Sequence, residues 1–271
     1  MNILLLGDIV GPVGRKVVLE KLPNLIQKKK IDFVILNGEN AADTGVGITK
    51  KIFNDFLEIG ADVITTGNHI WDEKEVIDFI PTEKRLLRPQ NLPEGSPGNG
   101  FGIFHSKNKK KVAVINLMGN VFMKKCDDVF KEAKKFIETV KLKKDADFII
   151  VDMHGETTSE KMAMGHLFDG YATMVVGTHT HVPTADCRIM EKGTAYQTDV
   201  GMCGDYNSVI GMKKELATSR FTTKMPQGRL EPADGEATIC AVYVETDNGT
   251  GLAKAVGALR IGGRLTNEWP V

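Results

Sequence analysis

Hydrophobic and polar positions alternate in blocks along the first third of the chain. Short runs rich in Val, Ile and Leu separate longer stretches in which apolar residues recur at helical spacing. This pattern predicts strands at residues 2–7, 32–38 and 61–67, with helices at 13–29 and 50–58 between them. Because these strands are almost continuously apolar, both faces of their sheet should be covered, as is typical of βαβ units in an α/β protein.

The remaining two thirds continue this pattern less regularly. Strands are predicted at 111–117, 146–156 and 171–182, with an amphipathic helix at about 127–141. The last third predicts short strands that we expect to be antiparallel, near residues 187–190, 194–198, 238–246 and 255–261. The polar, Gly- and Pro-containing stretch at about 205–235 predicts a loop or small cap within a single domain spanning 1–271.

Composition narrows the class of protein. The chain has a formal net charge of zero, which argues against a polyanion-binding surface over the whole molecule. The apolar run at the N-terminus reaches Asp8 after a few residues, so it is neither a signal peptide nor a membrane span. The four cysteines are far apart in sequence, without Cys-x-x-Cys spacing. We therefore expect reduced thiols, a cytoplasmic location and no association with a membrane.

Polar side chains follow the predicted strands where each strand ends. The first three strands end in glycine and continue as GDIVG, NGENAAD and GNHIWD, and the two later apolar strands lead into histidines. Since ligands of open α/β sheets bind outside the carboxyl ends of the strands, these side chains should converge at one edge of one sheet. The candidates are Asp8, Glu39, Asn40, Asn68, His69, His154, His179 and His181.

Carboxylates, neutral imidazoles and amide oxygens together suit a hard or borderline metal ion, and the absence of cysteine disfavours structural zinc. Each residue alone has a simpler structural explanation. Asp8 could cap a helix, Asn68 could be a turn residue, and His154 could be a core histidine with a hydrogen-bond partner. No Gly-Lys-Ser/Thr follows the first strand, so a Walker phosphate loop is excluded.

The sequence GTHTHV places His179 and His181 one residue apart. Alternate residues of an extended chain point the same way, so both imidazoles should share one face, with Thr180 turned the other way. A pair of histidines alone would indicate only a possible metal site. Together with the polar residues at four other strand ends, it predicts a metal centre.

The order Asp…Gly-Asn-His…His…Gly-x-His-x-His resembles the calcineurin-like metallophosphoesterase superfamily. Over essentially the whole chain the sequence is more narrowly similar to the YmdB-type phosphodiesterases, in the segments GDIVG, LNGENAA, TTGNHIWD, MHGETTSEK, GTHTHVPTAD and YQTDVGMCG. This resemblance implies a four-layer αββα sandwich of mixed sheets with flanking helices. It also implies two metal ions at the ends of parallel strands.

The resemblance assigns a role to each candidate. One ion would be held by Asp8, Glu39, Asn40 and His181, and the other by Glu39, Asn68, His154 and His179, with Glu39 bridging. His69 would be the general acid. Asp72, Thr157 and Asp199 are candidates for orienting the imidazoles or meeting the substrate.

Two positions depart from the wider superfamily. Val10 stands where most members have a histidine ligand, and Glu39 stands where an aspartate usually bridges. Both departures fit the YmdB-type group, in which the neighbouring Asn40 can compensate for the missing histidine. Mixed oxygen and nitrogen ligands are compatible with divalent or trivalent ions, and the resemblance favours iron, with manganese as an alternative and zinc less favoured.

The resemblance implies hydrolysis of cyclic nucleotides, 2′,3′-cyclic nucleotides such as 2′,3′-cAMP first, by a hydroxide bridging two metals. Two alternatives remain open from the sequence. One is a phosphomonoesterase, either a nucleotidase or a protein phosphatase, since the same metal core serves both reactions. The other is a non-catalytic, RNA-associated regulatory protein. RNA is otherwise expected as an indirect partner at most, and a homo-oligomer is expected.

Overall fold

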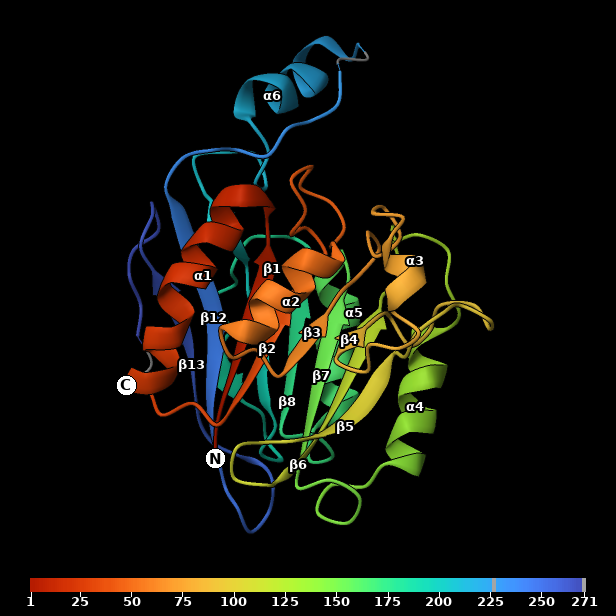
Figure 1. Cartoon of the computed structure of the whole chain (residues 1–271). Helices are drawn as coiled ribbons and strands as arrows, with labels where there is room; N and C mark the ends of the chain where they lie inside the picture. The colour runs from red at the N-terminus through yellow and green to blue at the C-terminus, as the bar shows by residue number, and fades with distance from the viewer. Residues whose placement is uncertain (226–227, 270–271) are drawn as a thin grey trace.

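The computed structural model describes residues 1–225 and 228–269 and contains two mixed β-sheets packed face to face (Figure 1). The strands of the first sheet are β1 (Asn2–Ile9), β2 (Phe33–Asn37), β3 (Val63–Thr65), β4 (Leu86–Leu87), β11 (Met202–Asp205), β12 (Ala237–Thr246) and β13 (Ala253–Ile261). They lie in the order β13-β12-β11-β1-β2-β3-β4, and β12 also pairs with the first part of β1. Strands β1 to β4 are parallel to one another.

The second sheet has six strands. They are β5 (Phe101–His105), β6 (Lys111–Met118), β7 (Phe148–His154), β8 (Met174–Thr178), β9 (Arg188–Ile189) and β10 (Ala195–Gln197). Their order is β5-β6-β7-β8-β10-β9, with β6, β7, β8 and β10 parallel. The carboxyl ends of the parallel strands in this sheet therefore meet at one edge.

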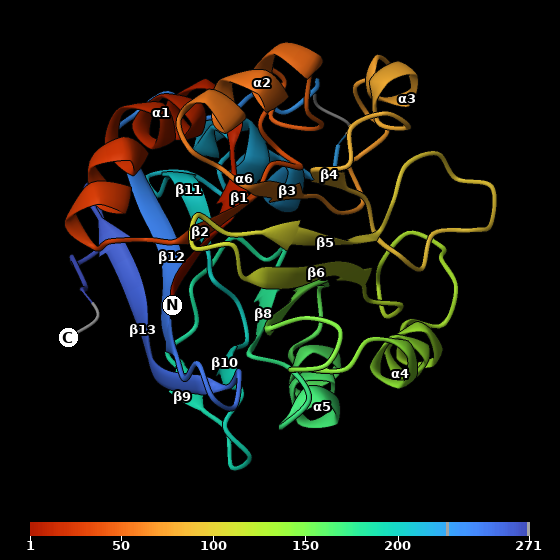
Figure 2. The same ribbon diagram turned by 60° about the horizontal axis from the view of Figure 1, so that its bottom comes forward.

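Helices cover the outer faces of both sheets. Figure 2 shows α1 (Gly11–Lys28), α2 (Lys50–Glu58) and α3 (Val76–Phe79) on one side, and α4 (Val129–Thr139) and α5 (Thr158–Phe168) on the other. The predicted four-layer αββα sandwich is thus confirmed. Among the described helices, none has both the length and the apolar composition needed to cross a membrane.

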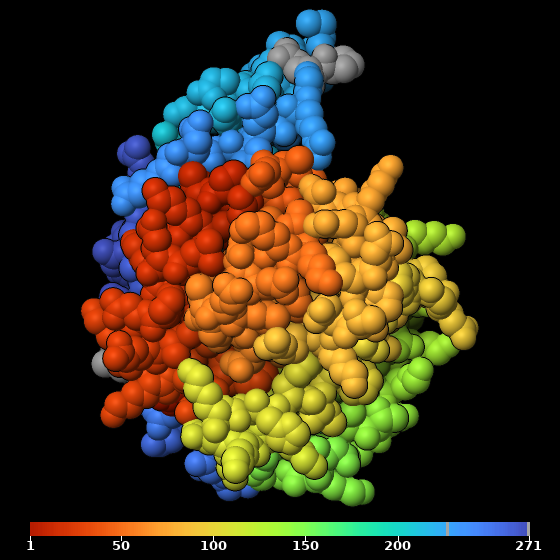
Figure 3. All heavy atoms as spheres, in the orientation of Figure 1, coloured from red at the N-terminus to blue at the C-terminus, as the bar shows by residue number. Residues whose placement is uncertain are grey.

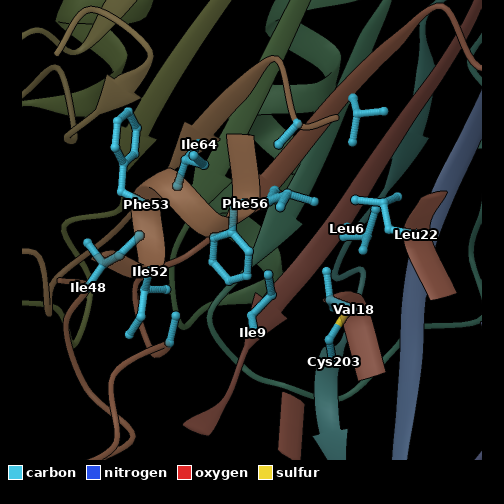
Figure 4. Packing of buried hydrophobic residues seen from close by; sticks show 14 of the residues in the cluster. Leu6, Ile9, Val18, Leu22, Ile48, Ile52, Phe53, Phe56, Ile64 and Cys203 are labelled. Carbon is cyan, nitrogen blue, oxygen red and sulfur yellow. The ribbon is translucent and has the colours of Figure 1, made fainter. Parts of the chain in front are cut away.

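The apolar strands are continuous because both of their faces are buried. In β1, Leu4 and Leu6 belong to the cluster under the helices, whereas Ile3 and Leu5 belong to the cluster between the sheets. Figure 4 shows the helix-covered face, where Phe53 and other side chains of α2 gather near side chains of α1 and the strands. Burial of both faces removes the polar alternation that would mark a half-exposed strand.

The expectation of antiparallel strands in the last third is confirmed for β9, β12 and β13 but requires correction for β10. Strand β10 is parallel to β8, and β11 is parallel to β1. Strand β12 is antiparallel to β1, β11 and β13, and the short strands β9 and β10 are antiparallel to each other. The pattern of a short apolar run identifies a strand but carries no information about its direction or its neighbours.

The cysteines behave as the sequence predicts. All four have free thiols, and Cys203 and Cys240 are buried. Their wide spacing in sequence is therefore matched by the absence of a disulfide between any of them.

Residues 206–236 connect β11 to β12 and are called the cap segment below. The segment contains α6 (Lys214–Thr223), within the stretch where the sequence predicts a loop or small cap. Figure 3 shows that the segment projects from the body of the molecule. Only Ala217 of α6 is buried, so this helix has no apolar stripe from which periodicity could predict it.

Candidate metal centre

The polar residues at the strand ends lie together, but they come from two sheets. Asp8 lies in β1, and Glu39 and Asn68 follow β2 and β3 of the first sheet, whereas His154 ends β7 of the second sheet. The prediction of one edge of one sheet is therefore wrong. Because the sheets pack face to face, residues from both can reach the same space, which strand patterns in a sequence do not reveal.

Three ligand-type atoms surround the Nε2 atom of His154. It lies 3.0 Å from Asn68 Oδ1, 3.0 Å from Glu39 Oε1 and 3.1 Å from His179 Nδ1. An imidazole nitrogen carries at most one hydrogen, so it cannot form hydrogen bonds with all three neighbours. Ligand atoms of Glu39, His154 and His179 all lie within 4.8 Å of one another, as expected for groups that can share a cation.

Three oxygens of the predicted ligands give a second reason to expect a cation here. Asp8 Oδ1, Glu39 Oε1 and Asn40 Oδ1 are buried and accept no hydrogen bond from the described residues. Unsatisfied buried oxygens are costly and rare in folded proteins. His181 Nε2 lies 4.0 Å from Asp8 Oδ1, so an imidazole nitrogen faces the same space. These atoms are suitable ligands for a hard or borderline ion.

The other polar atom of each of these three side chains is held by the backbone. Asp8 Oδ2 accepts the amide of His179 at 3.1 Å, and Glu39 Oε2 accepts the amide of His69 at 3.1 Å. Asn40 Nδ2 donates to the carbonyl of Gly45 at 2.9 Å. Each side chain is thus fixed in orientation, and one oxygen of each remains to bind an ion.

Gly67 leaves room for the centre. A Cβ atom at this position would lie 2.2 Å from His154 Nε2 and 2.3 Å from Glu39 Oε2. Both distances are far below van der Waals contact, so any larger residue would push into the space between these ligand atoms. The glycine that follows β3 in the sequence is therefore required by the site itself.

Two of the imidazoles are oriented through Nδ1. His181 Nδ1 lies 2.7 Å from the carbonyl of Ile210, so it donates and leaves Nε2 with a lone pair. His154 Nδ1 lies 2.9 Å from Thr178 Oγ1, and that hydroxyl donates to Asp152 Oδ1 at 2.7 Å. Sequence reasoning missed Asp152, although an aspartate inside the apolar run FIIVDMH was a signal for it.

The turn that follows β8 differs from the predicted extended chain. His179 and His181 have φ angles of 99° and 67°, so the argument from alternating side chains of a strand is wrong here. Asp199 Oδ2 fixes this turn by accepting from the amide of Thr180 at 3.0 Å and from its hydroxyl at 2.8 Å. The same oxygen pairs with Lys161 Nζ at 2.7 Å, and both of these side chains are buried.

His69 lies beside the cluster rather than within it. Its Nδ1 is 2.6 Å from Asp72 Oδ2, so Asp72 is placed to orient this imidazole. Nε2 is then the nitrogen left for a molecule in the cavity. The hydroxyl of Thr157, in contrast, donates to Glu160 Oε2 at 2.9 Å and holds no imidazole among the described residues.

The electrostatics of the cluster reflect close packing of charges. Burial opposes ionisation of Glu39, but the imidazoles of His154, His69 and His179 outweigh it and lower its pKa to about 2. Burial also opposes the charge on His154, yet the Glu39, Asp8 and Asp152 carboxylates raise its pKa to about 9. Burial, and next the His154 cation, lower the pKa of His179 to about 3. A bound cation would take the place of the His154 proton.

A cavity of about 450 Å³ opens over these residues. Glu39, His69 and His179 line it from the body of the protein, while Arg220 and Arg229 line it from the cap segment. This volume lies in the range of small-molecule sites. Sequence reasoning did not find the cap residues, because the loop pattern of their segment gives no indication of what it faces.

Known proteins are similar to this chain in sequence and in the arrangement of its strands. The model of a family described as YmdB-like protein matches residues 4–259. The chain belongs to the YmdB-like family. The resemblance expected from the strand-end motifs is thereby confirmed.

Relatives match nearly the full length of the chain. A protein of Bacillus subtilis (strain 168) named 2′,3′-cyclic-nucleotide 2′-phosphodiesterase is 48% identical, over 96% of this chain and 96% of the relative. A crystal structure from Mycoplasma pneumoniae, described as a novel phosphatase, is 38% identical with a TM-score of 0.90, and the match covers 97% of this chain and 93% of that one. A hypothetical protein from Thermus thermophilus has a TM-score of 0.89 at 38% identity, covering 97% and 100%.

In this YmdB-like chain, Val10 stands at the position where a histidine ligand is expected in the wider superfamily. Its side chain is buried and packs with Met202 and Met212, the latter from the cap segment. Val10 therefore contributes packing beneath the cap instead of a ligand atom. Asn40 is the residue expected to compensate, and its Oδ1 accepts no hydrogen bond from the described residues.

Proposed function

We propose that this protein is a metal-dependent phosphodiesterase that hydrolyses 2′,3′-cyclic nucleotides. The observation that carries the proposal is the convergence of Asn68 Oδ1, Glu39 Oε1 and His179 Nδ1 on His154 Nε2 at 3.0–3.1 Å, beneath a cavity of nucleotide scale. The Bacillus subtilis relative, 48% identical, supports the substrate class by its name. Water would attack phosphorus, and the bond between phosphorus and the 2′ oxygen would break. The product would carry a 3′-phosphate and a free 2′ hydroxyl.

Two ions are expected, with iron favoured over manganese. The first ion would be held by Asp8, Glu39, Asn40 and His181, and the second by Glu39, Asn68, His154 and His179. The unsatisfied oxygens of Asp8, Glu39 and Asn40 support this division. When bound, such a pair of ions supplies an activated water and neutralises charge on phosphoryl oxygens.

The chain itself supplies the proton. His69 would protonate the departing 2′ oxygen through Nε2, because its Nδ1 is held 2.6 Å from Asp72 Oδ2. The Asp72 carboxylate sets the orientation of the ring. Lys124 Nζ lies 3.5 Å from Asp72 Oδ1, which fixes the carboxylate in turn.

The decisive experiment compares substrates on protein purified without chelators, with bound metals measured on the same sample. We expect two ions per chain and hydrolysis of 2′,3′-cAMP faster than that of 3′,5′-cAMP. Bis(p-nitrophenyl) phosphate reports diesterase activity. Because the Mycoplasma pneumoniae structure is described as a phosphatase, p-nitrophenyl phosphate tests for monoesterase activity in parallel. Protein that holds two ions but hydrolyses no diester would contradict the proposal.

A further inference from the structure

The cap segment brings two cationic side chains to the cavity of the metal centre. Arg220 on α6 and Arg229 beyond it both line this cavity, together with Glu39 and His179. Arg220 Nη2 donates to the carbonyl of Gly228 at 2.7 Å, which connects the helix to the stretch of chain that carries Arg229. Neither arginine belongs to the proposed ligand set or acid.

The base of the cap segment is attached directly to the centre. The carbonyl of Ile210 accepts the hydrogen bond from Nδ1 of His181 at 2.7 Å, and Met212 packs with Val10 beneath the cap. A Cβ atom on Gly45 would lie 2.9 Å from the terminal methyl of Met212, so the cap also contacts the loop after β2. These contacts place the cap arginines over the centre rather than on an independent lobe.

Apolar side chains provide the third kind of surface in the cavity. They are Val46, Ile210, Met212 and Leu230, three of them from the cap segment. Ligand pockets commonly combine such apolar walls with a few polar groups that fix orientation. Here the cavity has carboxylate and imidazole groups from the body, an apolar wall, and two guanidinium groups.

Two guanidinium groups lining the cavity suit a second anionic group of the ligand, apart from the reacting phosphate. The charge of that phosphate is matched by the ions when they are bound, and the acidic Glu156 in the cavity is already 3.1 Å from His179 Nε2. Arginine binds phosphate oxygens through paired N–H donors. In a ribonucleotide, the next anion after a 2′,3′-cyclic phosphate is the phosphate on the 5′ side of the same nucleoside.

We propose that Arg220 and Arg229 bind this 5′-side phosphate, while the apolar wall contacts the nucleoside between the two phosphates. The inference rests on the phosphodiesterase function proposed above. It makes a nucleotide with a second phosphate the preferred substrate, either a free 5′-phosphorylated nucleotide or the 3′ end of an RNA chain. The second source would make RNA a direct substrate, in contrast to the indirect partner expected from the sequence.

The test uses three substrates on the metal-loaded full chain. They are adenosine 2′,3′-cyclic phosphate, its 5′-phosphorylated form, and a diadenosine dinucleotide that ends in a 2′,3′-cyclic phosphate. We expect the second phosphate to raise kcat/KM by about tenfold or more, as for a charge-assisted hydrogen bond, and the gain to fall at high salt. A gain for the dinucleotide assigns the source to RNA ends, and a gain for the 5′-phosphorylated nucleotide alone assigns it to free nucleotides.

Arg229→Gln should remove most of this gain, measured as the ratio of kcat/KM values with and without the second phosphate. Arg220→Gln should act in the same direction, but Arg220 also holds the Gly228 carbonyl, so Arg229 is the cleaner position. Lys224→Gln is the matched control, because Lys224 is an exposed cap cation that does not line the cavity. It should leave the ratio unchanged.

A binding measurement separates this inference from the proposed function. Adenosine 3′,5′-bisphosphate should bind the metal-loaded protein at least about tenfold more tightly than adenosine 3′-phosphate, and Arg229→Gln should remove the difference. Equal binding of the two ligands, with hydrolysis of 2′,3′-cAMP intact, would overturn the inference alone. Absence of hydrolysis with two ions bound would overturn the proposed function instead.

Discussion

His69 differs from the other imidazoles of the centre because its side chain is 29% exposed and its Nδ1 is paired with Asp72. It lies next to the ligand cluster without being surrounded by ligand atoms. We therefore expect His69→Gln to lower kcat for 2′,3′-cAMP by about 10²–10⁴-fold, the usual contribution of a general acid. Bound metal, measured on the same preparations, should stay at the wild-type level.

His105→Gln is the control for this substitution, because His105 is an exposed histidine on β5. It should leave both kcat and metal content unchanged. Loss of metal in His69→Gln would show that His69 is a ligand and that the proton comes from elsewhere.

Gly67 matters for the opposite reason, since the absence of a side chain there is what the centre needs. In Gly67→Ala the new methyl would lie 2.2 Å from His154 Nε2 and 2.3 Å from Glu39 Oε2. We expect the variant to lose most of its bound metal when both proteins are dialysed at the same free metal concentration. The ligands themselves are unchanged, so the loss would report geometry alone.

Gly155→Ala provides a comparison at another glycine close to the centre. A Cβ there would meet only ordinary contacts, the nearest 3.5 Å away at Gly119 Cα. This variant should keep its metal. Full metal content in Gly67→Ala would mean that the ions bind elsewhere than between His154 and Glu39.

At the scale of elements, the turn after β8 depends on α5. Lys161 of α5 and Asp199 form a buried ion pair at 2.7 Å, and Asp199 holds Thr180 between the two histidines. Removing one partner of a buried pair leaves an uncompensated charge and costs about 3–5 kcal/mol. We expect Lys161→Met to lower the free energy of unfolding by this amount in urea denaturation and to weaken metal binding.

Lys134→Met, on the exposed face of α4, is the matched control and should change stability by less than about 0.5 kcal/mol. An unfolding free energy of Lys161→Met equal to that of the wild type would show that the ion pair contributes nothing net. Unchanged metal affinity together with lost stability would mean that Asp199 holds the turn without its partner Lys161.

Some features of the strands and turns can be predicted from the sequence, and others cannot. Apolar runs located the strands and the polar residues at their ends, because burial on both faces leaves a clear signal. They could not show that Asp8 and His154 come from different sheets, since strand partners depend on packing between distant segments. Nor could they show the positive φ angles of His179 and His181, in a turn where the distant Asp199 accepts the amide hydrogen of Thr180.

Residues that act on the centre through other residues were still harder to predict from the sequence. Asp152 is fully buried and is linked to His154 through the Thr178 hydroxyl, so neither its position nor its role follows from spacing. The cap arginines lie in a segment whose helix buries a single alanine, and no periodic pattern connects them to the cavity. In each case the information lies in tertiary contacts.

At the scale of the whole molecule, the centre joins the two sheets. Asp8 and Glu39 reach it from the first sheet, and His154 and His179 reach it from the second. Ions bound there would connect the two halves of the sandwich in addition to the apolar core between them. Stability should therefore depend on metal, since any ligand that binds only the folded state stabilises it.

Metal removal tests this coupling. At a free metal concentration about 100 times Kd, the folded state gains about 2.7 kcal/mol, which for a chain of this size raises Tm by about 5–10 °C. We expect calorimetry to show a loss of this order after treatment with a chelator, and recovery when iron or manganese is added back. In Glu39→Gln, which removes the proposed bridging carboxylate, the shift should largely disappear. Equal Tm values for the loaded and stripped wild type would argue that the ions do not connect the sheets.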